Sequence, residues 1–374
     1  MQKVIIGFMA LTSFTALHSQ QSSIPGATEE VNQPVLQKNI RPVQNLFIIT
    51  IDGFRWEELF NGADAWLLNN EKFTPENEMI RSIYWAPTAE ERRKKLMPFL
   101  WNVIGVNGQV YGNRNFDNKV DVSNDYLKSY PGYSEIFTGF ANPDIISNKK
   151  IANPNINILE HLNSLPGFKD KVIAFTSWDV FPYILNEMRS GLLVNSGYDS
   201  LDNNDLTEEE TLLNKVSQEG IEEKTSTRYD QLTFIMAKDY IRLHHPRVVF
   251  LGLGETDEFA HQERYDLYLS QANQTDKMLA DLWHWVQTTP GYANNTTFLI
   301  TTDHGRGKKK KWTSHGTFIA GSSNTWIAIM GPGVQAKGEA KGYLQLYQQQ
   351  LAQTIAHLLG EEFININDSL PPLF

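Results

Sequence analysis

The sequence of 374 residues contains no cysteine. Disulfide bonds, thiolate zinc sites, a cysteine nucleophile, a formylglycine made from cysteine and a lipid on an N-terminal cysteine are therefore excluded. Any metal site in this chain must be built from histidine and carboxylate side chains.

Positively charged residues are outnumbered, since the chain has 33 Lys and Arg against 43 Asp and Glu and a formal net charge of −10. Proteins that bind polyanions by charge alone have the opposite sign, so bulk nucleic-acid binding is not expected. After the first 20 residues no apolar run reaches the roughly 18 residues of a membrane helix, so no membrane span is expected in the mature chain. Nothing in the sequence indicates an oligomeric state.

Residues 1–20 have the pattern of a secretory signal peptide. A lysine precedes the apolar run Val4–Leu17, which small polar residues follow. The run is too short to span a bilayer as an ordinary helix, and we expect cleavage near Ser19 or Gln20. The alternatives are an N-terminal anchor or a buried helix. We expect export to the periplasm, because small extracellular proteins often carry disulfide bonds and this chain has no cysteine. We interpret residues 21–44 as a polar linker.

The rest of the chain, residues 45–374, alternates apolar strands with helices. A hydrophobic fraction of 41% is typical of a globular protein. The predicted strands are Asn45–Ile51, Lys171–Phe175, Arg247–Leu253, Thr297–Thr301 and Thr325–Met330. The predicted helices are Tyr130–Phe140, Tyr229–Leu243, Tyr265–Val286 and Tyr343–Leu359. This alternation predicts an α/β fold with a mostly parallel central sheet sandwiched by helices.

Two segments interrupt the alternation, at about residues 61–121 and 190–224. The first is rich in Trp, Asn and charge, and the second carries the acidic, turn-forming stretch DNNDLTEEE. We interpret both as insertions that cap the site.

Acidic and histidine residues recur where the predicted strands end. Taken singly, each has a plainer explanation, such as a helix cap, a turn, a surface pair or a structural histidine. Together they converge on the carboxyl edge of the sheet, where ligands bind in such folds, and they suit two metal ions. The six candidate ligands are Asp52, Asp257, His261, Asp303, His304 and His315.

These residues resemble the alkaline phosphatase superfamily, especially its nucleotide pyrophosphatase/phosphodiesterase and one-domain bacterial alkaline phosphatase branches. The similarity extends from Asn45 to about Gly360, and the later TWIAIMGPGV segment resembles the strand and turn that follow the last histidine in many members. The resemblance implies two zinc ions. One would be held by Asp257, His261 and His315, and the other by Asp52, Asp303 and His304 together with the nucleophile.

The nucleophile is expected in the stretch SYPGYSEIFTG. Ser129 aligns with the threonine of both branches, and Pro131 belongs in the first turn of a helix, which places Ser129 at the N-cap, where phosphate is favoured. Ser134 is the alternative, because Ser-Glu-Ile is similar to the Ser-Glu-Val of cofactor-independent phosphoglycerate mutases. A plain helix cap at Ser129, with neither serine a nucleophile, is the third possibility.

Departures from the family pattern bear on the substrate. Gly132 stands where diesterases usually have an asparagine, whose side chain steadies a phosphoryl oxygen. Here that contact is left to the backbone or to another residue such as Asn153 or Asn155. The segment TSWDV at residues 176–180 lacks the Lys-x-Arg element of one-domain phosphatases, and the sulfatase motif is missing around Ser129. The basic residues Arg306 and Lys308–Lys311 lie between the Asp-His pair and His315. We interpret them as a solvated loop, and the alternative is that they help to neutralise charge at the site.

The sequence therefore predicts an exported two-metal hydrolase of small phosphoric esters that acts through a phosphoseryl intermediate, with diesters ahead of monoesters. The alternatives are a phosphomonoesterase, a phosphoglycerate mutase-like phosphotransferase and a non-catalytic zinc-binding protein. Zinc is expected from the ligand set, although Mn²⁺ or Fe also suits such sites.

Overall fold

The computed structural model describes residues 42–201, 206–219, 224, 226–363 and 370–374. The predicted signal peptide at residues 1–20 lies outside these residues, as does the predicted linker up to residue 41. Among the helices that the structure describes, none combines the length and the apolar character needed to cross a membrane.

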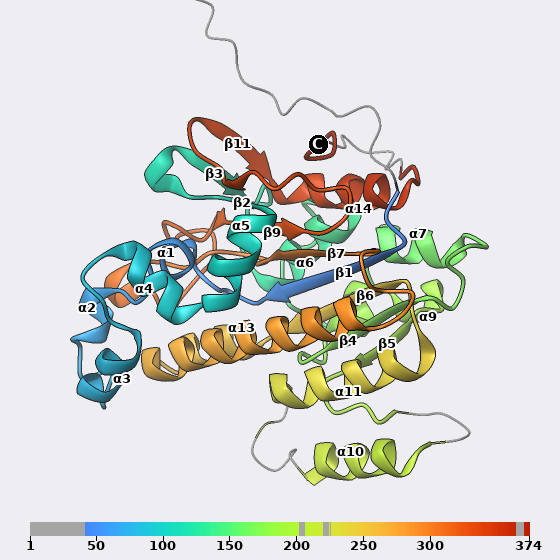
Figure 1. Ribbon diagram of the computed structural model, residues 1–374, viewed down its shortest axis with the longest axis horizontal. Helices are drawn as coiled ribbons and strands as arrows, with labels where there is room; N and C mark the ends of the chain where they lie inside the picture. The colour runs from blue at the N-terminus through green and yellow to red at the C-terminus, as the bar shows by residue number, and fades with distance from the viewer. Residues whose placement is uncertain (1–41, 202–205, 220–223, 225, 364–369) are drawn as a thin grey trace, which may run out of the picture. The chain divides into compact units, whose positions relative to one another are not determined.

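A mixed eight-stranded sheet in the order β10-β2-β9-β7-β1-β6-β4-β5 organises the fold (Figure 1). The five strands from β7 to β5 are all parallel, whereas β9 runs antiparallel to both β7 and β2. A small second sheet has the order β11-β3-β8. The strands are β1 (Asn45–Ile51), β2 (Gln109–Tyr111), β3 (Asn118–Asp121), β4 (Val172–Thr176), β5 (Leu193–Ser196), β6 (Val248–Leu253), β7 (Thr296–Thr301), β8 (Asn324–Thr325), β9 (Ile327–Met330), β10 (Gly338–Glu339) and β11 (Leu344–Tyr347).

Helices cover both faces of the large sheet. The α-helices are α1 (Trp56–Asn61), α2 (Ala65–Leu68), α3 (Asn77–Tyr84), α4 (Ala89–Leu96), α5 (Gly105–Asn107), α6 (Ser129–Thr138), α7 (Ile158–Ser164), α8 (Phe181–Ile184), α9 (Glu187–Ser190), α10 (Glu208–Glu219), α11 (Asp230–His244), α12 (Glu255–His261), α13 (Tyr265–Thr288) and α14 (Leu351–Leu359). A π-helical turn, η1 (Leu100–Ile104), and the 3₁₀ turns η2 (Arg114–Phe116), η4 (Lys309–Lys311) and η5 (Gln348–Gln350) complete the described elements.

The alternation of side chains along each strand divides the core into two layers. Phe47, Ile49 and Ile51 of β1 pack with α11, α13 and the α1–α4 segment. Leu46 and Ile48 face the opposite layer, which contains α6, α7, α8 and α14. Strands buried on both faces read as continuous apolar runs, which explains why β1, β6 and β7 could be located from sequence.

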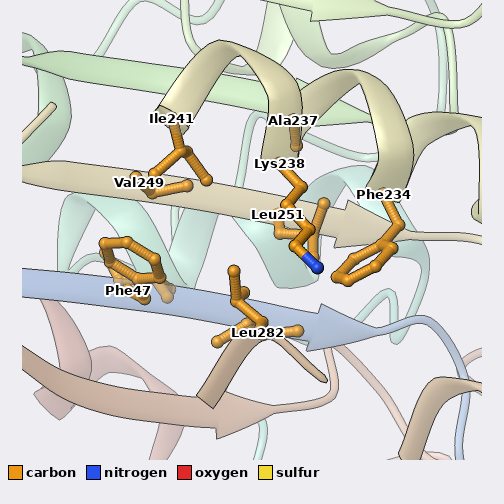
Figure 2. Close-up of a pocket in the computed structure, with 10 residues that line it drawn as sticks. Phe47, Phe234, Ala237, Lys238, Ile241, Val249, Leu251 and Leu282 are labelled. Carbon is orange, nitrogen blue, oxygen red and sulfur yellow. The ribbon is translucent and has the colours of Figure 1, made fainter. Parts of the chain in front are cut away.

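Figure 2 shows the contact between α11 and the sheet. Phe47 of β1 and Leu251 of β6 meet Phe234 and Ile241 of α11, and Leu282 of α13 closes the layer. The stem of the neighbouring Lys238 lies along this apolar surface, and its ammonium reaches Asp281 at 2.5 Å. This layer supports the middle of the sheet below the strand ends that carry the candidate site.

The predicted fold class, with a mostly parallel sheet between layers of helices, is confirmed. The predicted helix Tyr343–Leu359 is wrong in its first half, because Leu344–Tyr347 forms strand β11 and only Leu351–Leu359 is α-helical. Alternating side chains in LQLY suit a strand beside β3, and Leu346 is buried there. The predicted strand Thr325–Met330 is divided between two sheets, since Thr325 belongs to β8 and Ile327–Met330 to β9.

The two predicted insertions fold differently. Residues 61–121 form α2 to α5 with strands β2 and β3, and their apolar side chains, such as Trp101, join the main core. Residues 190–224 contribute β5, at one edge of the sheet, and α10, apart from the stretches that the structure does not describe. The first segment is thus an extension of the core and the sheet edge.

Candidate active site at the carboxyl edge of the sheet

The carboxyl ends of three neighbouring parallel strands bring the predicted ligands together. Strand β1 lies between β6 and β7, and all three run in one direction. Asp52 directly follows β1, and Asp303 follows β7 after one residue. The other predicted ligands come from the helix after β6 and from the loop after β7, namely Asp257, His261, His304 and His315.

The first cluster consists of Asp52, Asp303 and His304. The Nε2 atom of His304 lies 3.6 Å from Asp52 Oδ1 and 3.4 Å from Asp303 Oδ2. Both carboxylate atoms are buried, and neither has a hydrogen-bond partner among the described residues. Three acceptor atoms that face one another in the interior need a cation or protons between them.

The second cluster consists of Asp257, His261 and His315. His261 Nε2 lies 3.1 Å from Asp257 Oδ2 and 3.2 Å from His315 Nε2. Asp257 Oδ1 is also 3.9 Å from both His304 Nε2 and His315 Nε2, and the rings of His304 and His315 stack with centroids 3.8 Å apart. The donor set of Asp257, His304 and His315 is compact enough to hold a metal ion, as is that of the first cluster. His304 belongs to both sets.

Backbone carbonyl groups fix the orientation of two histidine rings. His304 Nδ1 lies 3.0 Å from the carbonyl oxygen of Gly305, and His315 Nδ1 lies 2.9 Å from that of Leu127. Because a carbonyl oxygen only accepts, each Nδ1 carries the proton and each Nε2 presents a lone pair to the clusters. This pattern, a ring held from behind with its other nitrogen free to bind, is typical of histidine ligands of metal ions.

Burial sets the charge state of the clusters. It lowers the pKa of His304 to about 4 and that of His315 to about 3, so both rings are neutral at physiological pH. Burial and the neighbouring carboxylates raise the pKa of Asp303 to about 7 and that of Asp52 well above its usual range. Without a cation, the carboxylates of the first cluster therefore retain protons that exposed carboxylates would have lost.

Asp257 has the opposite electrostatic environment, because a guanidinium lies beside it. Burial raises the pKa of Asp257, yet Arg306, the next largest influence, brings it well below its usual range. Arg306 is buried and donates to Asp257 Oδ1 and to the carbonyl oxygens of Trp312 and Thr313. The expectation that Arg306 belongs to a solvated loop is therefore wrong, although Lys308–Lys311 are exposed as expected. The guanidinium of Arg306 holds both the Asp257 carboxylate and the backbone of the segment that leads to His315.

Gly53 lets the backbone turn tightly between the two clusters. Its φ is +57°, and its N–H donates to Asp303 Oδ1 at 3.0 Å. A Cβ atom at this position would lie 2.6 Å from Asp257 Oδ1 and 2.9 Å from an Arg306 nitrogen. The glycine after Asp52 is thus required by both conformation and space.

Ser129 opens helix α6 and lies beside the clusters. Its Oγ is 3.3 Å from His304 Nε2, and it lines a pocket of about 380 Å³ together with Asp52 and Asp257. The helix begins at Ser129 itself and its N-cap is Lys128, one residue earlier than predicted. The alternative residue, Ser134, lies one turn deeper in the helix, where its Oγ accepts from the Nδ2 group of Asn153 at 3.0 Å, and it does not line the pocket.

A buried carboxylate holds the loop in front of Ser129. Glu135 accepts hydrogen bonds from the backbone N–H groups of Ser123 and Asn124 and from Asn124 Nδ2, all at 2.8–3.0 Å. Asn124 Oδ1 in turn accepts from the N–H of Leu127, whose φ is +51°. The carbonyl of Leu127 is the acceptor for His315. One network therefore positions the loop that supports this histidine and leads into the helix of Ser129.

Sequence reasoning missed Asn148, which lines the pocket beside Ser129. Its Oδ1 accepts from the backbone N–H of Tyr130 at 3.0 Å. The expected candidates Asn153 and Asn155 hydrogen-bond to Ser134 and to each other instead. Gly132 has no room for a side chain, because a Cβ atom would lie 2.5 Å from the carbonyl oxygen of Asp303. Asn148 lies in an exposed loop without a recognisable motif, so no sequence signal marked it.

The outer part of the pocket is uncharged or acidic. Its lining also includes Trp178, Thr227, Glu258 and Gln262, and none of the described lining residues is lysine or arginine. Lys224 lies near this part of the lining, but its ammonium pairs with Glu255 at 2.6 Å and with Glu258 at 2.9 Å.

No protein-family model and no curated protein matches this sequence. Solved structures with the same fold do exist. Wild-type alkaline phosphatase PafA aligns with a TM-score of 0.56 at 12% identity, over 89% of this chain and 99% of that one. The phosphonate monoester hydrolase of Agrobacterium radiobacter gives 0.52 at 13% identity, over 86% and 74%. Murine ectonucleotide pyrophosphatase/phosphodiesterase 5, in complex with AMP, gives 0.50 at 12% identity, over 88% and 96%.

The chain therefore has the fold of the alkaline phosphatase superfamily, and the resemblance read from its motifs is confirmed at the level of the fold. A 2-O GAG sulfatase also aligns, with a TM-score of 0.54 at 11% identity, over 88% of this chain and 73% of that one. Phosphatases, phosphodiesterases and sulfatases thus share this architecture, and the choice among activities depends on the site.

Proposed function

We propose that this protein is a metal-dependent hydrolase of phosphoric esters, with diesters preferred, and that Ser129 is its nucleophile. The observation that carries the proposal is the position of Ser129 Oγ, which lies 3.3 Å from His304 Nε2 in the cluster where Asp52 Oδ1 and Asp303 Oδ2 are buried without a hydrogen-bond partner among the described residues. A helix N-terminus at this place adds backbone N–H groups that favour a phosphate.

The donor set fits a pair of divalent cations. The proposed ligands are Asp52, Asp303 and His304 for one ion and Asp257, His261 and His315 for the other, with His304 near both. Oxygen and neutral imidazole donors suit zinc, and Mn²⁺ or Fe also suits them. Bound ions would neutralise charge on the phosphoryl oxygens and stabilise the ionised hydroxyl of the nucleophile.

The protein's own residues supply the covalent chemistry and the orientation. The Oγ of Ser129 releases its proton to water and forms a bond to phosphorus, while the bond to the ester oxygen opposite breaks and the departing alcohol takes up a proton. The serine then carries the phosphoryl group with its remaining ester substituent, until water hydrolyses this bond and returns the proton to Ser129. Tyr133, one turn along the helix, donates to Asp52 Oδ2 at 3.0 Å and holds that carboxylate in place. Asn148 lies where its amide can contact a phosphoryl oxygen.

The lining of the pocket supports a diester rather than a monoester. A phosphate monoester carries one more negative charge than a diester at neutral pH, and the lining contains Glu258 but no lysine or arginine. Trp178 stands in the segment where the one-domain phosphatases have their Lys-x-Arg element. A sulfate ester also carries a single charge, but this chain has no cysteine and lacks the serine-type sulfatase motif.

The test compares an aryl phosphate monoester with a diester of the same leaving group, on zinc-reconstituted wild type, Ser129→Ala and Ser134→Ala. We expect faster diester hydrolysis, lost by more than about 10³-fold in Ser129→Ala and largely retained in Ser134→Ala, which removes a buried serine of the same helix. Full activity of Ser129→Ala would refute the nucleophile. No hydrolysis of either ester by zinc-loaded wild type would refute the proposed activity.

A further inference from the structure

A second pocket, of about 420 Å³, lies beside the candidate active site and is mainly apolar. We define it as the isoleucine pocket. Its apolar and aromatic lining residues are Tyr130, Ile145, Ile146, Ile151, Ala152 and Pro154, and Asp144, Ser147 and Lys149 complete the lining. Ile146 and Ile151 are 52% and 65% exposed, which is unusual for two isoleucines that share one hollow. Clustered exposed apolar side chains in a hollow are typical of a binding groove.

The isoleucine pocket and the candidate active site share a wall. Ser129 and Asn148 line the active site, whereas their chain neighbours Tyr130, Ser147 and Lys149 line the isoleucine pocket. Two hydrogen bonds of Tyr130 tie this wall to the start of α6. Its N–H donates to Asn148 Oδ1 at 3.0 Å, and its hydroxyl donates to the carbonyl of Ile151 at 2.6 Å.

From this arrangement, and resting on the proposed function, we propose that the isoleucine pocket binds an alkyl or acyl chain esterified to the phosphate of the substrate. The segment 146–151 contributes to both pockets, since Asn148 lines the active site and Ile146 and Ile151 line the isoleucine pocket. The apolar lining suits a hydrocarbon chain rather than a sugar, which would require more hydrogen-bonding groups.

Charged groups at the isoleucine pocket are few and of both signs. Lys149 lines it, and the ammonium of Lys128, the residue before Ser129, donates to the carbonyl of Ile146 at 3.2 Å. Asp144 also lines the pocket and offsets the charge of Lys149. The isoleucine pocket therefore favours an uncharged hydrocarbon chain over a charged group.

The test measures kcat/KM for a series of p-nitrophenyl alkyl phosphodiesters with methyl, butyl and octyl chains, each below its micelle concentration. In zinc-loaded wild type we expect kcat/KM to rise by about two- to fourfold for each methylene that becomes buried. A flat series with measurable methyl hydrolysis would overturn the isoleucine pocket as a chain site while leaving the proposed function intact.

Substitutions of exposed isoleucines distinguish binding in the isoleucine pocket from a general preference for hydrophobic substrates. Ile146→Asn and Ile151→Asn should reduce the octyl-to-methyl ratio of kcat/KM by at least tenfold. Ile156→Asn is the matched control, because Ile156 is 57% exposed on the same segment but does not line the pocket. An unchanged ratio in both pocket variants would overturn the proposal. A flat series together with altered sedimentation in Ile151→Asn would also overturn it and would identify a second copy of the chain as the occupant.

A binding measurement distinguishes failure of this proposal from failure of the proposed function. If no ester is hydrolysed, calorimetric titration of Ser129→Ala with octyl phosphate and with methyl phosphate still reports on the pocket. Tighter binding of octyl phosphate, reversed by Ile151→Asn and not by Ile156→Asn, would support the chain site without any turnover. Equal binding of the two phosphates would overturn it.

Discussion

Removal of metal should expose an electrostatic penalty at Asp303 that depends on pH. Burial and neighbouring charge raise the pKa of Asp303 to about 7 in the folded protein, whereas its ordinary value is 3.8. Between these two values the folded protein holds a proton that the unfolded chain has released. Folding stability contributed by this group therefore falls as pH rises, and the loss is complete once pH passes the folded pKa.

The size of the effect follows from the shift itself. Each unit of pKa difference corresponds to about 1.4 kcal/mol, so raising the pH from about 5.5 to 8 costs the metal-free protein roughly 2 kcal/mol through Asp303. His304 and His315 have the opposite effect, because burial lowers their pKa values in the folded protein. Their contribution to folding stability is lost as pH falls below about 6.5, where the unfolded chain takes up protons that the folded protein does not. A comparison with Asp303→Asn, which retains both histidines, isolates the carboxylate.

The assay is denaturant unfolding of chelator-treated wild type and Asp303→Asn at the two pH values. We expect wild type to lose about 2 kcal/mol more than the variant on going to the higher pH, and zinc to restore stability to wild type there by neutralising the buried, ionised carboxylate. Identical pH dependence in the two proteins would refute the assignment of this penalty to Asp303. Failure of zinc to stabilise wild type would refute the metal site.

Three further outcomes follow from the geometry. Tyr133→Phe removes the hydroxyl that donates to Asp52 and should weaken zinc binding by about 10- to 100-fold in a chelator competition, with little change in melting temperature. Gly53→Ala places a Cβ atom 2.6 Å from Asp257 Oδ1 at a φ of +57°, so it should lower both zinc affinity and stability, the latter by about 1–3 kcal/mol in denaturant unfolding. Ile241→Ala, in the layer of Figure 2, should cost about 2–5 kcal/mol of unfolding free energy while kcat/KM stays within a few fold; unaltered stability would contradict the packing described there.

Buried strands and their polar ends were the parts that the sequence predicted well. Asn45–Ile51 was located to the residue because a strand covered on both faces must be apolar throughout, and Asp52 marks its end. The first half of the predicted helix Tyr343–Leu359 was wrong because LQLYQQQL has a mixed pattern. Its first four residues form a strand only through contact with β3, more than two hundred residues earlier in the chain.

Single side chains outside motifs were beyond prediction for a different reason. Arg306 stands at the start of a basic stretch, and only the tertiary structure distinguishes its buried guanidinium beside Asp257 from the exposed lysines that follow. Asn148 reaches the pocket because Tyr130 holds its side chain in place. Both positions depend on contacts between distant segments, which neither periodicity nor spacing encodes.

The hydrogen-bond network around Glu135 couples the position of Ser129 to that of His315. The loop it holds supports His315 on one side and continues into Ser129 on the other, although these two residues are 186 positions apart in the sequence. A displacement of the loop would move both together, so their mutual alignment tolerates small movements of the surrounding structure better than either position alone. The same link means that a substitution at Glu135 would displace both Ser129 and His315, although Glu135 lines neither the pocket nor the clusters.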